Sequence, residues 1–60
     1  MENRNVIRVD AMIDDLRKRN SCIETKLPDG RTDGLGQRVR DYIEATIDEL
    51  IYLRDKYGKE

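Results

Sequence analysis

The chain has 60 residues, of which 42% are charged and 37% are hydrophobic, and it contains no Trp, Phe or His. A chain of this length buries only about 60% of the surface that it exposes when unfolded, which excludes a large private core and makes a partner chain the expected source of stability. Twelve basic and thirteen acidic residues give a net charge of -1, which excludes a polybasic nucleic-acid arm and an acidic tail.

The N-terminal sequence and the cysteine content indicate where the protein works. The first five residues lack the apolar stretch of a signal peptide, and no apolar run approaches the ~18 residues of a membrane span. The single cysteine, Cys22, cannot form a disulfide within the chain, and without His it has no partners for a zinc or haem site. We therefore expect a cytoplasmic protein with no membrane partner, no metal and no cofactor.

Apolar residues in the first half of the chain recur with the 3-4 spacing of a helical seam. They are Val6, Val9, Ile13, Leu16, Ile23 and Leu27. This spacing predicts a helix over about residues 5-27, which Pro28 ends because the residue before a proline is pushed out of the α region. Asn20 fills the vacant step of the seam, and we expect it to lie in the helix interface and to set register or partner number, as a buried Asn does in coiled coils.

The same segment also fits a second interpretation that contains strands. Residues 6-9 would form a short strand, and Asp10 would cap a helix that runs to Asn20. Ile23, Thr25 and Leu27 would then alternate in a second strand. The sequence leaves both interpretations open.

Residues 28-36 form the clear break in the sequence, with one proline, three glycines and two turn-forming aspartates, and we place the loop at 28-35. Within it, Asp29 to Gly34 resembles the opening of a calcium-binding EF-hand loop, with carboxylates at the first and fifth positions and glycine at the sixth. Arg31 occupies the third ligand position and Arg40 the twelfth, where a bidentate Glu is needed. We therefore expect a plain turn here.

The segment after the loop is predicted to be a helix over about residues 36-57. Val39, Ile43, Leu50, Leu53 and Tyr57 repeat with heptad spacing. Neighbouring apolar residues, Ile47 among them, widen the apolar side to roughly half of the helix circumference, which is more than one neighbouring helix can cover. Gly58 follows at the position where a left-handed C-terminal cap is common.

Two helices of similar length joined by a reversing loop predict an all-α fold, with residues 1-60 forming a single antiparallel helical hairpin. Because two helices enclose no core, we expect two copies to assemble into a homodimeric four-helix bundle. The expected oligomer interface consists of the seam residues of both helices: Val6, Val9, Ile13, Leu16, Asn20, Ile23, Val39, Ile43, Ile47, Leu50, Leu53 and Tyr57.

Basic residues concentrate toward the loop. Residues 17-40 contain seven basic and three acidic residues, a net charge of +4, whereas residues 1-16 and 41-60 together carry -5. The candidate contacts for an anion or a nucleic acid are Arg17, Lys18, Arg19, Arg31, Arg38 and Arg40. A second interpretation is that each basic loop end faces the acidic open end of a partner hairpin, which would place the two loops at opposite ends of the dimer.

Part of the second helix is similar to that of the small helical hairpins that dephosphorylate phospho-aspartate regulators, through Gly34-Leu35, Ile47-Asp48 and Leu50-Ile51. The Ser-Gln-Glu-Leu-Asp motif of that family corresponds to residues 44-48, where the Asp and an approximate Leu are retained. The resemblance implies that Asp48 would be the catalytic residue. The plan of two equal helices in a dimeric bundle also resembles the plasmid RNA-binding protein Rop, in architecture alone.

Without His and without a Ser-His arrangement, the sequence offers little for acid-base or nucleophilic catalysis, and we expect no catalytic residue. We expect a small non-catalytic binding or regulatory protein that is oligomeric and acts by protein-protein interaction through a helical surface. Its expected partners are a second copy of itself and an unidentified protein. The alternatives are a nucleic-acid-binding module that uses the loop-end arginines, and an aspartyl-phosphate phosphatase of the small helical-hairpin type.

Overall fold

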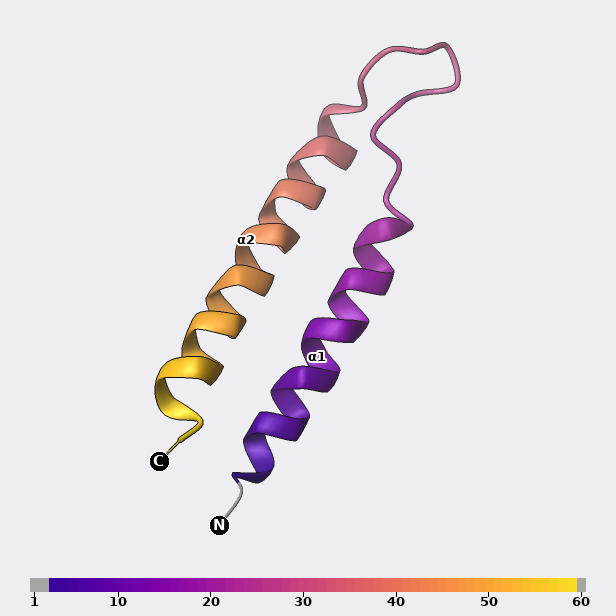
Figure 1. Cartoon of the computed structure of the whole chain (residues 1–60). Coiled ribbons are helices and arrows are strands. Elements are labelled where there is room, and N and C mark those ends of the chain that lie inside the picture. Colours follow the sequence, from indigo (N-terminus) through magenta and orange to yellow (C-terminus); the bar gives the residue numbers. More distant parts are fainter. Residues whose placement is uncertain (1–2, 60) are drawn as a thin grey trace.

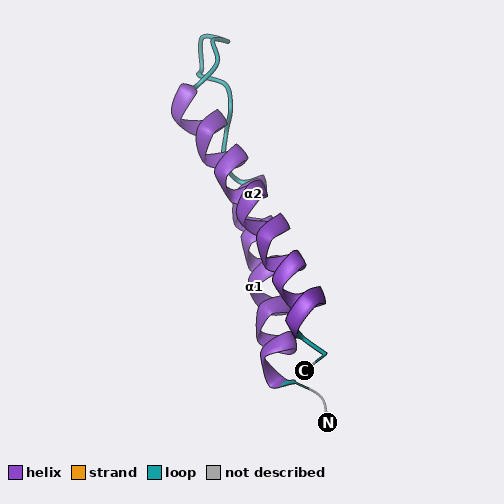
Figure 2. Ribbon diagram, turned by 90° about the vertical axis from the view of Figure 1, so that its left-hand side faces the viewer, coloured by secondary structure: helices purple, strands orange, loops and turns teal. Residues whose placement is uncertain are grey.

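The computed structural model describes residues 3-59 and contains two α-helices, α1 (Arg4–Ser21) and α2 (Gly34–Tyr57), joined by a loop over residues 22-33. The helices run antiparallel and pack side by side, with the loop projecting beyond them at one end and the start of α1 beside the end of α2 at the other (Figure 1). Seen from the side, the pair is narrow and one layer thick (Figure 2), with extents of 53 × 15 × 10 Å. The predicted all-α hairpin is therefore confirmed.

Both helices begin at a polar side chain that caps free backbone N–H groups. The Asn3 side chain accepts a hydrogen bond of 2.9 Å from the N–H of Asn5. The Asp33 carboxylate accepts from the N–H groups of Leu35 and Gly36, at 3.0 and 3.3 Å. Such caps satisfy donors that have no partner within the helix, and a carboxylate also suits the positive end of the helix dipole. This is why α2 begins at Gly34, earlier than the predicted residue 36.

The predicted end of the first helix at residue 27 is wrong, because α1 ends at Ser21. The N–H groups of Cys22 and Ile23 each bond to the carbonyl three residues earlier, both at 3.1 Å, which tightens the last turn. The Ser21 hydroxyl also donates to the carbonyl of Lys18 at 2.7 Å. These bonds use the last carbonyls of the helix locally, so Pro28 is not what terminates it.

Residues 23-27 are extended and pair with the chain that returns toward α2. Lys26 and Thr32 form an isolated antiparallel bridge, flanked by hydrogen bonds from Leu27 N–H to the Arg31 carbonyl (2.7 Å) and from Asp33 N–H to the Thr25 carbonyl (2.8 Å). Half-buried Ile23, Thr25 and Leu27 alternate with exposed neighbours, as expected for extended chain. The interpretation with strands was therefore right about the extended chain here and wrong for residues 6-9, which are helical.

The tip of the loop is a tight turn over residues 27-30. The N–H of Gly30 bonds to the Leu27 carbonyl at 2.9 Å, and Gly30 has a φ of 92°, which glycine adopts without the strain that a side chain would cause. The Asp29 carboxylate accepts from the Arg31 N–H and also forms an ion pair of 2.6 Å with its guanidinium. The segment that resembles an EF-hand opening is thus a turn held by its own side chains.

Two glycines let other parts of the chain approach closely, one near each end of the hairpin. A Cβ atom on Gly36 would overlap the backbone carbonyl of Glu24, and one on Gly58 would lie 2.8 Å from the Val6 side chain. Gly58 has a φ of -68°, so the expected left-handed cap is wrong: this glycine is needed for space. These two contacts hold α2 against the loop at one end and against the start of α1 at the other.

Substitution of Gly36 tests the close contact with the loop. Gly36→Ala should lower the free energy of unfolding by about 1-3 kcal/mol, because the clash is with backbone that must move. Gly34→Ala is the matched control, since a Cβ there meets nothing within 4 Å and alanine favours the helix by up to about 0.5 kcal/mol. Chemical denaturation of both variants gives the comparison, and equal stabilities would contradict the contact.

Candidate functional site

The line of contact between the two helices divides the hairpin into two faces. Three side chains are buried along this line: Ile13 and Asn20 of α1 and Ile47 of α2. Within residues 3-59, the two isoleucines are the only buried large apolar side chains. Since successive helical residues are ~100° apart, Leu16 lies on one side of the line and Arg17 on the other. The two sides differ in chemistry.

One side, which we call the apolar face, carries Val9, Leu16, Val39, Ile43, Leu53 and Tyr57. A hollow of about 130 Å³ in its loop half is lined by Leu16, Ile23, Val39 and Ile43, with Asn20 and Arg19. This hollow adjoins another of about 380 Å³ beside Leu35, because Ile23 and Val39 line both. A third, of about 170 Å³, lies at the open end, where α1 begins and α2 ends. The apolar face is therefore grooved along much of its length.

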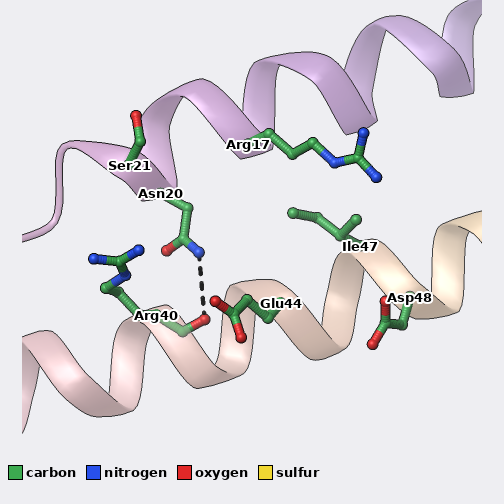
Figure 3. A pocket seen from close by; sticks show the side chains of 7 residues that line it. All are labelled: Arg17, Asn20, Ser21, Arg40, Glu44, Ile47 and Asp48. Carbon is green, nitrogen blue, oxygen red and sulfur yellow. Dashed lines mark hydrogen bonds between the residues drawn. The ribbon is translucent and has the colours of Figure 1, made fainter.

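The opposite side, which we call the polar face, holds a hollow of about 380 Å³ whose rim is charged. Arg17 and Ser21 of α1 line it together with Arg40, Glu44 and Asp48 of α2, and Asn20 and Ile47 lie between the helices (Figure 3). Two guanidinium and two carboxylate groups balance each other there. Neither sign of charge prevails, so the hollow is a poor site for a polyanion or a lone cation.

Asn20 is the one buried polar side chain within residues 3-59, with 6% of its surface exposed. Its Nδ2 donates to the backbone carbonyl of Arg40 at 3.4 Å, whereas its buried Oδ1 has no hydrogen-bond partner among the described residues (Figure 3). Asn20 lines both the polar hollow and the loop-half hollow of the apolar face. As expected, it lies between helices; its effect on register or partner number remains a prediction.

The six basic residues expected to contact an anion do not form one surface. Lys18, Arg19 and Arg31 each pair with an aspartate close in sequence, at 3.0, 3.0 and 2.6 Å. Arg17 and Arg40 lie together in the polar hollow, beside the two carboxylates described above. Arg38 is exposed and makes no ion pair with the part of the chain described here.

The register of the helices also reduces the charge difference between the two ends. Arg17 lies beside Ile47 in the polar hollow, so the loop half of the hairpin spans residues 17-47 and includes Asp41 and Glu44. These residues carry seven basic and five acidic groups, a net charge of +2. Residues 3-16 and 48-59 carry -1, while Glu2 and Glu60 lie outside the described residues. Counted over the full sequence with this division, the contrast is +2 against -3, which is smaller than the expected +4 and -5.

Near the open end, a single ion pair joins the two helices within residues 3-59. The Arg54 guanidinium contacts Asp10 of α1 at 2.7 Å and Asp55 of its own helix at 3.2 Å. The hydrogen bond with Asp10, followed by that with Asp55, raises the pKa of Arg54 above its ordinary value. The charged guanidinium links α1 to α2 near the contact of Gly58 with Val6.

The candidate metal ligands and the candidate catalytic residue can now be placed in the structure. No group of three or more Cys, Asp or Glu residues within residues 3-59 is arranged to hold a metal ion. Asp48 stands at the edge of an open hollow, with an arginine and a second carboxylate as its charged neighbours and no His in the chain. Cys22 is an exposed free thiol.

Comparison with known proteins identifies no relative. No protein-family model matches the sequence, and neither a curated protein nor a solved structure gives a match. In the described residues, neither helix is long and apolar enough to cross a membrane. The assignment of function therefore rests on the two faces of the hairpin.

The Asp10–Arg54 pair generates a prediction about stability. Asp10→Asn should lower the melting temperature, because it removes the partner of Arg54 on the opposite helix. Asp55→Asn is the matched control, since Asp55 belongs to the same helix as Arg54 and should matter less for holding the helices together. Thermal unfolding followed by circular dichroism measures both variants; a larger effect of Asp55→Asn would contradict this role.

Proposed function

We propose that the protein is a small non-catalytic binding protein that works as a dimer and acts by protein-protein interaction through its helices. In this proposal the apolar face of one hairpin packs on the apolar face of a second copy, which produces a four-helix bundle. The charged polar faces remain outside, where they keep the assembly in solution and meet further proteins. The second copy is the occupant of the apolar face to which we commit.

The amount of exposed surface carries this proposal. The single chain exposes 5133 Å², whereas a compact monomer of 7.1 kDa exposes about 4,100 Å². The difference, roughly 1,000 Å², is similar to the ~800 Å² that each partner buries in a stable protein-protein interface. The radius of gyration agrees, at 14.9 Å against about 10 Å for a compact domain of this length.

The distribution of apolar side chains supports a partner of the same shape. Ile13 and Ile47 are the two buried large apolar side chains within residues 3-59, whereas seven large apolar or aromatic side chains are exposed by 42% or more: Ile7, Met12, Leu35, Tyr42, Tyr52, Leu53 and Tyr57. The apolar face is grooved and runs toward both ends of the hairpin, which suits another helical pair better than a small ligand. Burying it would supply the hydrophobic stabilisation that a lone hairpin lacks.

Substitution on the apolar face tests the dimer. Leu53, with 42% of its surface exposed, lines the open-end hollow, and Leu53→Glu would bury a charge in the interface. We expect dimerisation to weaken by at least about 30-fold, or ~2 kcal/mol. The control is Ile7→Glu, because Ile7 is 60% exposed and lies about 120° from Ile13 on the side of the polar face, away from the proposed interface.

Light scattering and sedimentation equilibrium of the unmodified protein and both variants give the readout. The proposal predicts a dimer for the unmodified protein and for Ile7→Glu, with dissociation for Leu53→Glu. A folded 7.1 kDa monomer at micromolar concentration would overturn the proposal. So would equal effects of the two substitutions.

The nucleic-acid alternative makes a different prediction. Non-specific nucleic-acid binding depends on phosphate contacts, so its affinity falls steeply as salt rises. Because three of the six candidate basic residues are paired and two face carboxylates, we expect no binding of duplex RNA or DNA at physiological salt. Fluorescence anisotropy with protein up to about 100 μM measures this. Tight binding that weakens with salt and is lost in Arg17→Gln/Arg40→Gln would favour the alternative.

A further inference from the structure

We propose that in the dimer the Tyr57 ring of each copy enters the loop-half hollow of the other copy, where its hydroxyl donates a hydrogen bond to Oδ1 of Asn20. This arrangement places the two loops at opposite ends of the bundle. The inference rests on the dimer proposed above and specifies its geometry. It also assigns a role to the one buried polar side chain of the described chain.

The acceptor in this pairing is the unpartnered amide oxygen. Asn20 is more than nine-tenths buried, and its Oδ1 has no partner in residues 3-59. A buried acceptor without a donor is unfavourable, and native proteins rarely retain one. Asn20 borders a hollow whose other walls are mainly Leu16, Ile23, Val39 and Ile43. The fitting occupant has an apolar body and a single hydrogen-bond donor at its tip, and a tyrosine side chain has this form.

Tyr57 is the tyrosine that lies on the apolar face at the far end of the hairpin. It lines the open-end hollow with 47% of its surface exposed, and its hydroxyl makes no hydrogen bond to the described residues. Lys56 lies 5.3 Å from its ring centroid and so partly covers one side of the ring. Tyr52 is on the wrong side of the helix, because it lies about 140° from Ile47 on the side of the polar face, where its hydroxyl accepts from the Lys56 ammonium at 3.2 Å.

The positions of donor and acceptor decide the orientation of the two copies. Tyr57 lies at the open end and Asn20 in the loop half, so Tyr57 of one copy reaches Asn20 of the other only when the hairpins point in opposite directions. With both loops at the same end, exposed Tyr42 would be the tyrosine beside Asn20. Tyr42 and Tyr57 therefore distinguish the two arrangements.

Two further observations favour opposite directions. Leu35 is 75% exposed at the loop end, and opposite directions place it toward the open end of the other copy. The same direction would instead bring the two copies of Leu35 together, beside two projecting loops. The loop half carries a net charge of +2 and the described residues of the other half carry -1. Opposite directions place the positive half of one copy beside the negative half of the other, which also favours this arrangement.

A double-mutant cycle on the full chain tests the contact. Tyr57→Phe removes only the hydroxyl, and Asn20→Leu removes the acceptor while keeping a side chain of similar size. We expect Tyr57→Phe to weaken dimerisation about two- to tenfold in the unmodified chain and to have no such effect when Asn20→Leu is also present. Tyr52→Phe is the matched control, expected to show no coupling to Asn20→Leu. Sedimentation equilibrium gives the dissociation constants.

The outcomes separate this inference from the proposed dimer. A monomeric protein would overturn both. A dimer without coupling between positions 57 and 20, or with coupling between positions 42 and 20, would overturn this inference and leave the dimer intact.

Distances between spin labels on Cys22 test the orientation without changing either residue of the pair, which matters if Asn20→Leu fails to fold. Cys22 is exposed and follows α1 at the loop end. Labels that lie well apart support opposite directions. A short distance, or ready formation of a Cys22–Cys22 disulfide within the dimer, would place the loops together and overturn the inference.

Discussion

The scarcity of buried apolar surface is the constraint on which the rest of this structure depends. Two helices meet along a single line, so each can cover only a narrow strip of the other, and here that strip buries Ile13 and Ile47, which remain 4% and 6% exposed. At roughly 25 cal/mol per Å² of buried apolar surface, such a strip offsets little of the conformational entropy lost on folding. In the proposed dimer each hairpin supplies half of the core, and the apolar face of the second copy supplies the other half.

The remaining contacts of the hairpin fix its geometry more than they stabilise it. Gly36 and Gly58 allow close approach at the two ends, and the Asp10–Arg54 pair joins the helices near the open end. Ion pairs exposed to solvent contribute little free energy, and each cap satisfies a few N–H groups. What these contacts do is set which residues of α1 lie beside which residues of α2. The shape of the apolar face follows from that register.

The hairpin could be predicted from the sequence because its strongest signals are periodic. The heptad spacing after the loop gives α2 almost to the residue, and the cluster of Pro, Gly and Asp marks the turn. The end of α1 could not be predicted in the same way, because Ile23 and Leu27 are four residues apart and fit both a helical seam and an alternating extended chain. Local bonds from Ser21 and the pairing of residues 25-33 decide between them.

The candidate site was less predictable, since it depends on register. Summing charges along the sequence suggests a basic loop end, but the register of the helices places Glu44 and Asp48 in the polar hollow with Arg17. Arg17 and Arg40 thus meet carboxylates, which the spacing of the arginines alone does not reveal. The sequence shows Asn20 as the polar residue in an apolar seam. Only the structure shows that its Nδ2 donates to the Arg40 carbonyl while its Oδ1 has no donor.

The unpartnered Oδ1 of Asn20 also affects how specifically two hairpins would pair. Apolar faces alone would allow two hairpins to pair in either direction and to slide along one another, because hydrophobic contact is not directional. A buried acceptor changes this, since each register that leaves it without a donor carries the cost of its desolvation. A single buried Asn fixes register and partner number in coiled coils by the same penalty. Asn20 lies where the contact line of the hairpin meets the apolar face, so one side chain can impose that penalty on both the packing of the helices and the choice of partner.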